Sequence, residues 1–234
     1  MTVTSTSLTR AAGVAAAAAG AIFIAVQIGH PQLDLTSITT TDVLIRDSFK
    51  VLMCPLALAG ITGMYLSQLR RNGVLGLVGY LMFAAGYLSI MCTSFLAAFV
   101  APIIAGINPG YVQDVIALST ARGTVTGDLG ALTTVWKVQG ALYLAGGLLF
   151  GIALFRAHVL ARWASVLLAV SGLLSAALAV MPDAFYRLLA YPNGIAMIGL
   201  GVSLWRSQRT APSGQTSAGE SSSSPAVTPA PAVR

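Results

Sequence analysis

The sequence predicts an all-α membrane protein, a polytopic bundle of six transmembrane helices with its N-terminus and C-terminus in the cytoplasm. Of the 234 residues, 56% are hydrophobic and 9% are charged, whereas soluble domains carry about 25% charged residues. Six apolar runs have the roughly 20 residues that crossing a bilayer requires, and the charges between them are sorted by sign. The predicted spans are residues 11–29, 51–69, 74–100, 136–155, 163–181 and 184–205.

The distribution of charge orients the predicted spans. With the N-terminus inside, eight of the 13 Lys and Arg residues lie on the inner side, and six of the seven acids lie outside. An excess of Lys and Arg in short loops marks the cytoplasmic side, and the turns at Arg70-Arg71 and from Arg156 to Arg162 carry it most clearly. The cations are scattered and form no basic stripe, so we expect membrane lipid as a partner and no nucleic acid.

The first predicted span, residues 11–29, follows Arg10 and is rich in alanine. A secretory signal is the alternative interpretation, because a single cation, an apolar core and small residues are typical of one. This core is long for a signal, and its removal would leave an odd number of spans. We therefore expect a retained helix between a cytoplasmic N-terminus at 1–10 and an outer loop at 30–50.

The second and third spans differ in how clearly they are bounded. Residues 51–69 contain no charge, and Pro55 predicts a kink there. Residues 72–113 also lack charge, and splitting them near Cys92 would give seven helices and reverse the orientation of everything downstream. The charge pattern favours one helix at 74–100. Residues 101–107 then extend this helix, re-enter the membrane or lie in the interface.

The second outer loop, residues 101–135, is expected to contain a short helix. Residues 111–121 space their apolar side chains like an amphipathic helix. Asn108-Pro109 supplies a start signal, because proline is favoured in the first turn of a helix. We expect this helix to lie along the outer membrane surface or to cap the bundle.

The last three spans are marked by tryptophans at their ends. Trp136, Trp163 and Trp205 lie at predicted boundaries, as expected for interfacial indole rings. Tyr191-Pro192-Asn193-Gly194 interrupts the sixth span and predicts either a proline kink or a broken helix of the kind that binds substrates in transporters. Residues 207–234 are rich in Ser, Pro and Ala and predict a disordered cytoplasmic tail.

Polar side chains near the outer ends of the spans are the candidate ligand-binding residues. If the helices pack as a bundle, these groups could converge on an outward-facing pocket. The alternative is that the cations snorkel to the interface and form structural ion pairs. The candidates are Arg46, Asp47, Lys50, Lys137, Gln139, Asp183 and Arg187.

Cys54 and Cys92 both fall within about 10 Å of the outer face, on helices joined by a short turn. Ordinary packing is the default, and a disulfide is the first alternative at an oxidising face. Each cysteine follows a methionine, and soft sulfur ligands suit Cu(I). Neighbouring helical side chains point about 100° apart, however, so we expect no metal site.

No motif predicts a catalytic residue or a cofactor. No Asp, Glu, His or Arg lies at mid-membrane depth, which disfavours ion-coupled transport and intramembrane proteolysis.

The leading interpretation is a non-enzymatic accessory, sensing or interaction protein, with a protein partner or a second copy beside lipid. The alternatives are a passive or facilitated small-solute transporter, or a lipid-directed enzyme. The transporter would use a polar path of Ser89, Thr93, Ser171, Ser175 and Asn193, and the enzyme would use Asp47, Asp128 and Asp183.

Several segments together resemble one group of bacterial membrane proteins. They are Arg10-Ala-Ala-Gly13, the Ala-rich first helix closing in Gly29-His30-Pro31, the arginine-marked inner turns and the Ser/Pro/Ala tail. These features resemble uncharacterised six-helix integral membrane proteins of high-GC actinobacteria. The resemblance implies a multi-pass protein of the bacterial plasma (inner) membrane, and it implies no activity and no functional residues.

Overall fold

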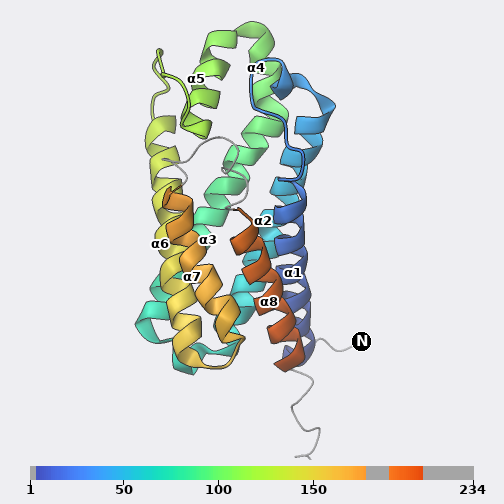
Figure 1. The fold of residues 1–234 in the computed structure, drawn as a ribbon, viewed down its shortest axis with the longest axis vertical. Helices are drawn as coiled ribbons and strands as arrows, with labels where there is room; N and C mark the ends of the chain where they lie inside the picture. The colour runs from blue at the N-terminus through green and yellow to red at the C-terminus, as the bar shows by residue number, and fades with distance from the viewer. Residues whose placement is uncertain (1–3, 178–189, 208–234) are drawn as a thin grey trace, which may run out of the picture.

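The computed structural model of the protein describes residues 4–177 and 190–207, and their regular structure is entirely helical (Figure 1). A 3-10 turn, η1, and a π-helical stretch, η2, accompany eight α-helices. The elements are α1 (Ser5–Ala25), η1 (Ser37–Thr39), α2 (Thr41–Ser67), α3 (Leu69–Phe95), η2 (Leu96–Val100), α4 (Ala101–Ile107), α5 (Pro109–Thr120), α6 (Leu132–Ala157), α7 (Arg162–Ala177) and α8 (Ala190–Ser207).

Six of these helices form a closed ring in the order α1, α2, α3, α6, α7, α8 and back to α1. Neighbouring helices run in opposite directions, so α1 begins and α8 ends at the same end of the bundle (Figure 1). The centre of the ring is apolar, with Phe83, Phe150, Leu168 and Leu200 fully buried. Helices α4 and α5 lie at the opposite end, beyond the ring.

Glycines allow the closest helix contacts. A Cβ atom on Gly20 would clash with the carbonyl oxygen of Gly194, across the α1–α8 contact. A Cβ atom on Gly79 would lie 2.5 Å from the backbone nitrogen of Phe150, across the α3–α6 contact. In a bilayer, helices associate through such close packing because lipid offers no hydrophobic drive for them to do so.

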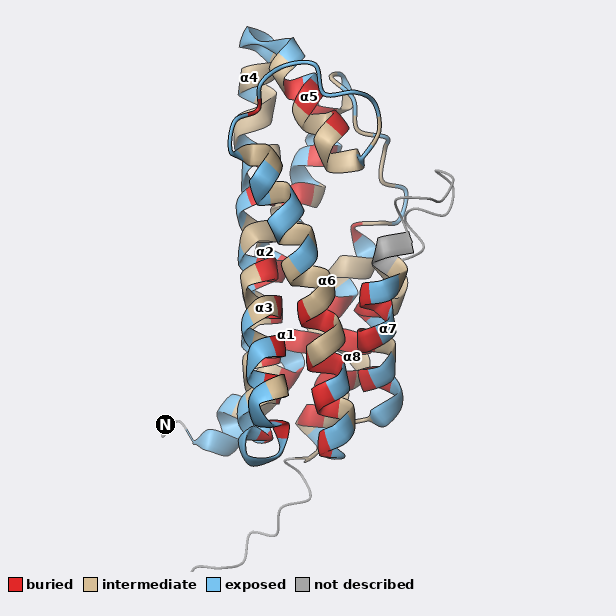
Figure 2. Cartoon of the chain, turned by 90° about the vertical axis from the view of Figure 1, so that its left-hand side faces the viewer, coloured by how far each residue is buried: buried red, intermediate tan, exposed pale blue. Residues whose placement is uncertain are grey.

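Apolar side chains cover the outside of the bundle as well as its core. Exposed residues run along the outer faces of the helices (Figure 2), and Leu81, Leu88 and Leu173 are among them. Four of the described helices are long and apolar enough to cross a membrane: Ser5–Ala25, Thr41–Ser67, Leu69–Ile107 and Leu132–Ala157. A surface of this kind is stable when lipid is its solvent, so the chain has the features of a membrane protein.

Most of the long uncharged segment forms one helix that is not split near Cys92, as the charge pattern predicted. The helical run Leu69–Ile107 has 39 residues and is kinked at Gly73, whose φ of 55° is not helical. The part after Gly73 is about 50 Å long at 1.5 Å per residue, against a hydrocarbon core of about 30 Å. Residues 101–107 therefore extend the third helix. Pro102 lacks an N–H and crowds the carbonyl four residues earlier, and the wider π-helical turns of η2 directly precede it.

Other predicted boundaries need correction. The outer loop was predicted at 30–50, but α2 already begins at Thr41, where the Oγ1 of Thr40 accepts a hydrogen bond from the Val43 amide. Hydropathy misplaced this start because the first helical turns of α2 carry charges. The amphipathic helix predicted at 111–121 is confirmed, although it begins at Pro109 after an Asn108 cap.

The sequence predicted either a proline kink or a broken helix at residues 191–194. The described part of α8 is helical without a break from Ala190 to Ser207, so the broken-helix alternative is not seen there. Residues 178–189, which include parts of the fifth and sixth predicted spans, and the predicted tail beyond Ser207 lie outside the described residues.

Candidate functional site

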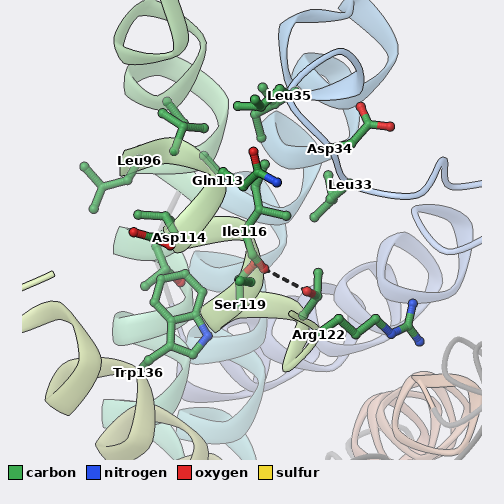
Figure 3. Close-up of a pocket in the computed structure, with 18 of the residues that line it drawn as sticks. Leu33, Asp34, Leu35, Leu96, Gln113, Asp114, Ile116, Ser119, Arg122 and Trp136 are labelled. Atoms are coloured by element: carbon green, nitrogen blue, oxygen red, sulfur yellow. Dashed lines mark hydrogen bonds between the residues drawn. The ribbon is translucent and has the colours of Figure 1, made fainter. Parts of the chain in front are cut away.

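A cavity of about 960 Å³ lies beneath α5, at the end of the molecule remote from the N-terminus. We call it the cap cavity. Its walls come from the loop after α1, from α2, from α3 with η2 and α4, from α5 and from the start of α6. Figure 3 shows Trp136 of α6 standing beneath α5, near Asp114 and Ser119. A cavity of this size matches those that hold small molecules.

Helix α5 is held as the roof of the cavity at both ends. At its start, the Oδ1 of Asn108 accepts a hydrogen bond from the Tyr111 amide at 3.1 Å. Val112, on its inner face, packs with Ile38 and Val43 in a small apolar cluster separate from the main core. The roof is therefore attached to α2 and to the loop after α1, as well as to its own chain neighbours.

Asp114 fastens the loop that follows α5. Its carboxylate accepts hydrogen bonds from the Thr126 amide at 2.9 Å and the Gly127 amide at 2.8 Å, and it also contacts the Thr126 hydroxyl. These hydrogen bonds, from Thr126 first and then from Gly127, lower the pKa of Asp114 below its ordinary value. The carboxylate is thus ionised at neutral pH and committed to the loop.

A short network of hydrogen-bonded side chains lies on one wall of the cavity. Lys50 donates to the Oδ1 of Asp47 at 2.6 Å and lies 3.3 Å from the Nε2 of His30. The Nδ1 of His30 lies 2.8 Å from the Pro31 carbonyl oxygen, which can only accept a hydrogen bond. His30 therefore carries its proton on Nδ1, and Nε2 accepts from the Lys50 ammonium. The Asp47 carboxylate is buried and its charge is balanced.

Among the described residues, a polar layer and then the apolar core lie below the cavity. The Thr93 hydroxyl donates to the Oε1 of Gln139 at 3.1 Å, across α3 and α6. Four residues further along α6, Tyr143 accepts a hydrogen bond from the side-chain amide of Asn193. Beyond this polar layer lies the fully buried apolar core of the ring, including Phe83 and Phe150. Within the described residues, the cavity is therefore blind on this side.

The predicted site residues divide into three groups. Asp47, Lys50 and Gln139 line the cap cavity. Arg46 faces elsewhere: it pairs with Asp42 at 2.9 Å and donates to the carbonyl oxygens of Val26 and Ile28, which holds the end of the first helix. Lys137 is exposed and is not among the lining residues. Asp183 and Arg187 lie outside the described residues.

The two cysteines are free thiols in this structure. Cys54 is completely buried in the core of the ring, whereas Cys92 is exposed on the surface of α3. The two side chains have different environments, one packed and one facing outward, and the disulfide that was the first alternative to ordinary packing is not formed in this structure.

Some lining residues were not among the predicted ligand-binding residues, and they include His30, Asp114 and Trp136. His30 and Lys50 are 20 positions apart, and no local pattern links them. Asp114 gave a usable signal, because it lies among the apolar positions of a predicted amphipathic helix, where a buried carboxylate needs hydrogen-bond donors. Trp136 had been interpreted as an interfacial anchor.

The ionic groups that line the cavity are largely engaged with the protein. Asp47 pairs with Lys50, Asp114 binds the loop, and Asp34 accepts hydrogen bonds from the Ser37 and Thr36 amides at 2.7 and 2.9 Å. The remaining polar groups in the lining are the Arg122 guanidinium, the His30 ring, and neutral amides, hydroxyls and an indole, as in Gln139, Ser94 and Trp136. With two cations against three carboxylates in its lining, the cavity carries little net charge, and its neutral groups offer hydrogen bonds.

No protein-family model, no curated protein and no solved structure matches the chain. Its function is therefore inferred from the geometry of the cap cavity and from the charge pattern of the chain.

Proposed function

We propose that this chain is a six-span protein of the bacterial plasma membrane that binds a small molecule from the outer side, in a sensing or accessory role. Both ends of the chain then lie in the cytoplasm. The charge pattern supports this orientation, because the arginine-marked turns lie at the end where α1 begins. The cap cavity lies at the opposite end and faces the outside in this arrangement.

The blind floor is the single observation that carries the proposal. A transporter needs a polar path through the bundle, and the described members of the predicted path do not join. Ser89 and Ser171 donate to carbonyl oxygens of their own helices, and apolar residues fill the ring below Asn193. A pocket that opens on one side suits binding and sensing.

The lining favours an uncharged amphiphile as the ligand. Its apolar part would lie beneath α5, against Ile104, Val112 and Ile116, and its polar part would reach Ser94 and Gln139 on the floor. A charged ligand would gain little binding energy in this cavity, because the lining acids and Lys50 already have hydrogen-bond partners in the protein. The same engagement argues against Asp47 as the general acid or base of a lipid-directed enzyme. Of the other two acids expected for an enzyme, Asp128 does not line the cavity, and Asp183 lies outside the described residues.

Filling the cavity provides the test. Ala97 lines the cavity from η2, so Ala97→Phe should occupy the ligand's space. Ala141→Phe adds the same ring at an exposed position of α6 that does not line the cavity. The wild type and both variants are purified from native membranes, and bound small molecules are identified by mass spectrometry. We expect one compound that accompanies the wild type and Ala141→Phe and falls at least about tenfold in Ala97→Phe. Equal recovery from all three proteins, or no bound compound in any, would refute the proposal.

A further inference from the structure

A second cavity lies at the opposite end of the bundle, where two helix junctions meet. It is open to the surface and has a volume of about 670 Å³ between the α2–α3 junction and the α6–α7 junction. We call it the junction cavity. Its polar lining residues include Gln68, Arg70, Arg71 and His158. The Nη1 of Arg71 lies 3.5 Å from the Ala157 carbonyl oxygen, so the two junctions are in contact.

The backbone of the two junctions places these side chains side by side. Gln68 caps the end of α2, and residues 69–72 form one turn before Gly73 redirects the chain with a φ of 55°. His158 caps the end of α6 and has a left-handed φ of 56°. Both redirections turn the chain sharply at the same end of the bundle. Arg70, Arg71 and His158 are exposed there.

The cations of the junction cavity have no acid beside them among its lining residues. The acids in the described part of the chain are Asp34, Asp42, Asp47, Asp114 and Asp128, which belong to α2, to the roof helix or to loops at the cap end. A phosphate group carries negative charge and only acceptor oxygens, so it complements exposed guanidinium groups.

The side chain of Gln68 contains an acceptor that needs a hydrogen-bond donor, and a phosphate group, which has only acceptor oxygens, cannot supply one. Its side chain is only 3% exposed, its Nε2 donates to the Met64 carbonyl oxygen, and its Oε1 has no hydrogen-bond partner. The Met64 carbonyl can only accept, which fixes the orientation of the amide. Gln68 lines the cavity, and its Oε1 is a buried acceptor that lacks a donor; such groups are costly unless paired.

Apolar side chains complete the site. Leu66 and Leu69 are more than half exposed, at 61% and 54%, and Val159 is exposed as well. All three line the junction cavity beside the arginines.

We propose that this cavity binds an anionic glycerophospholipid whose headgroup carries hydroxyl groups. The arginines bind the phosphate, a headgroup hydroxyl donates to Gln68, and the acyl chains lie on the leucines. This lipid site is independent of the ligand of the cap cavity.

Lipid selectivity tests the site directly. The full-length protein in detergent is titrated with dioctanoyl phosphatidylglycerol, dioctanoyl phosphatidylcholine and inorganic phosphate, and bound species are counted by native mass spectrometry. We expect phosphatidylglycerol to bind at least about tenfold more tightly than phosphatidylcholine, since each cation at a membrane surface contributes about a fivefold attraction. Equal binding of the two lipids would overturn the proposal. Inorganic phosphate binding as tightly as phosphatidylglycerol would overturn the assignment to a lipid.

Single substitutions separate this site from general surface charge. Arg70→Gln and Arg71→Gln should each weaken phosphatidylglycerol binding about fivefold. Arg156→Gln removes the same charge from an exposed position of α6 outside the cavity, and it should leave binding unchanged. An equal loss in all three variants would mean diffuse attraction and would contradict the site.

Gln68→Leu gives a readout that a purely structural role would not produce. It removes a buried acceptor without a partner, so the variant should unfold at the same or a higher temperature in phosphatidylcholine. It keeps every charge, and it should lower affinity for phosphatidylglycerol severalfold because the headgroup hydroxyl loses its acceptor. Unchanged phosphatidylglycerol affinity in a folded Gln68→Leu protein would refute the role of Gln68.

Discussion

Two side chains of α5 hold this helix in place over the cap cavity. Asp114 faces inward from α5 and binds two backbone amides of the following loop. Val112, two residues earlier, packs on Ile38 and Val43. The roof is thus held by one ionised carboxylate and one apolar contact.

Asp114→Asn should loosen this loop at neutral pH. An asparagine side chain has one acceptor oxygen, and its amide group opposes the second backbone N–H. We expect hydrogen exchange at the Thr126 and Gly127 amides to rise about three- to tenfold. Asp128→Asn is the control, because exposed Asp128 accepts a hydrogen bond from the nearby Gly130 amide and not from Thr126 or Gly127. Unchanged exchange in Asp114→Asn would show that the carboxylate does not hold the loop.

The pH dependence of the wild type follows from the direction of the pKa shift. The folded state lowers the pKa of Asp114, so its contribution is fully present above the ordinary carboxyl range. The contribution is lost as the pH falls through the lowered value. Exchange in the wild type, corrected for its intrinsic pH dependence, should therefore approach that of Asp114→Asn only below about pH 4.

At the residue scale, contacts close in sequence were the predictable ones. Asp47 and Lys50 are three positions apart on one helix and form the pair that their spacing favours. His30 and Thr93 could not be assigned to the cavity in advance. Their partners, Lys50 and Gln139, lie 20 and 46 positions away, and only the packed ring brings them together.

At the scale of elements, close glycine contacts set how the helices pack. The α3–α6 pair approaches closely at Gly79, where any side chain would meet the Phe150 backbone. A Cβ atom on Gly140 of α6, by contrast, would have no neighbouring atom within 4 Å. The same Gly→Ala substitution would therefore meet a tight backbone contact at Gly79 and open space at Gly140.

Gly79→Ala and Gly140→Ala should therefore change stability in opposite directions. The first forces the α3 and α6 backbones apart and should cost about 1–3 kcal/mol. The second removes a flexible residue from a helix without a clash and should gain up to about 1 kcal/mol. Thermal unfolding in one detergent measures both. Equal stability of the two variants would mean that the α3–α6 contact is not as close as described.

Hydropathy predicted where the helices lie more reliably than where they begin and end. It locates the apolar segments that face lipid or the core, whereas the ends of a helix are set by capping residues and glycines. Thr40 begins α2 eleven residues before the predicted span, and Asn108 begins α5. The uncharged run was correctly predicted as one helix because splitting it would have reversed the charge pattern of the later turns.

At the scale of the whole molecule, the chain has two tiers. The ring of six helices is apolar inside and outside, while α2 and the long α3–α4 helix reach past α1 and carry α5 above the ring (Figure 1). The sequence predicted that polar groups converge on an outward-facing pocket but not which residues form its walls, because these come from five segments separated along the chain. We assign ligand binding to this end and lipid binding to the other.

The most direct test measures from which side the floor of the cap cavity can be reached. Ser94 lines the cavity and is 8% exposed, so Ser94→Cys places a thiol there in a Cys54→Ala/Cys92→Ala background. Ser67→Cys, at the exposed end of α2 beside the junction cavity, is the matched control. Each variant is treated with a membrane-impermeant thiol reagent in intact cells and in inside-out vesicles. We predict that Ser94→Cys reacts only in intact cells and Ser67→Cys only in inside-out vesicles. Reaction of Ser94→Cys in inside-out vesicles would contradict a blind, outward-facing cavity.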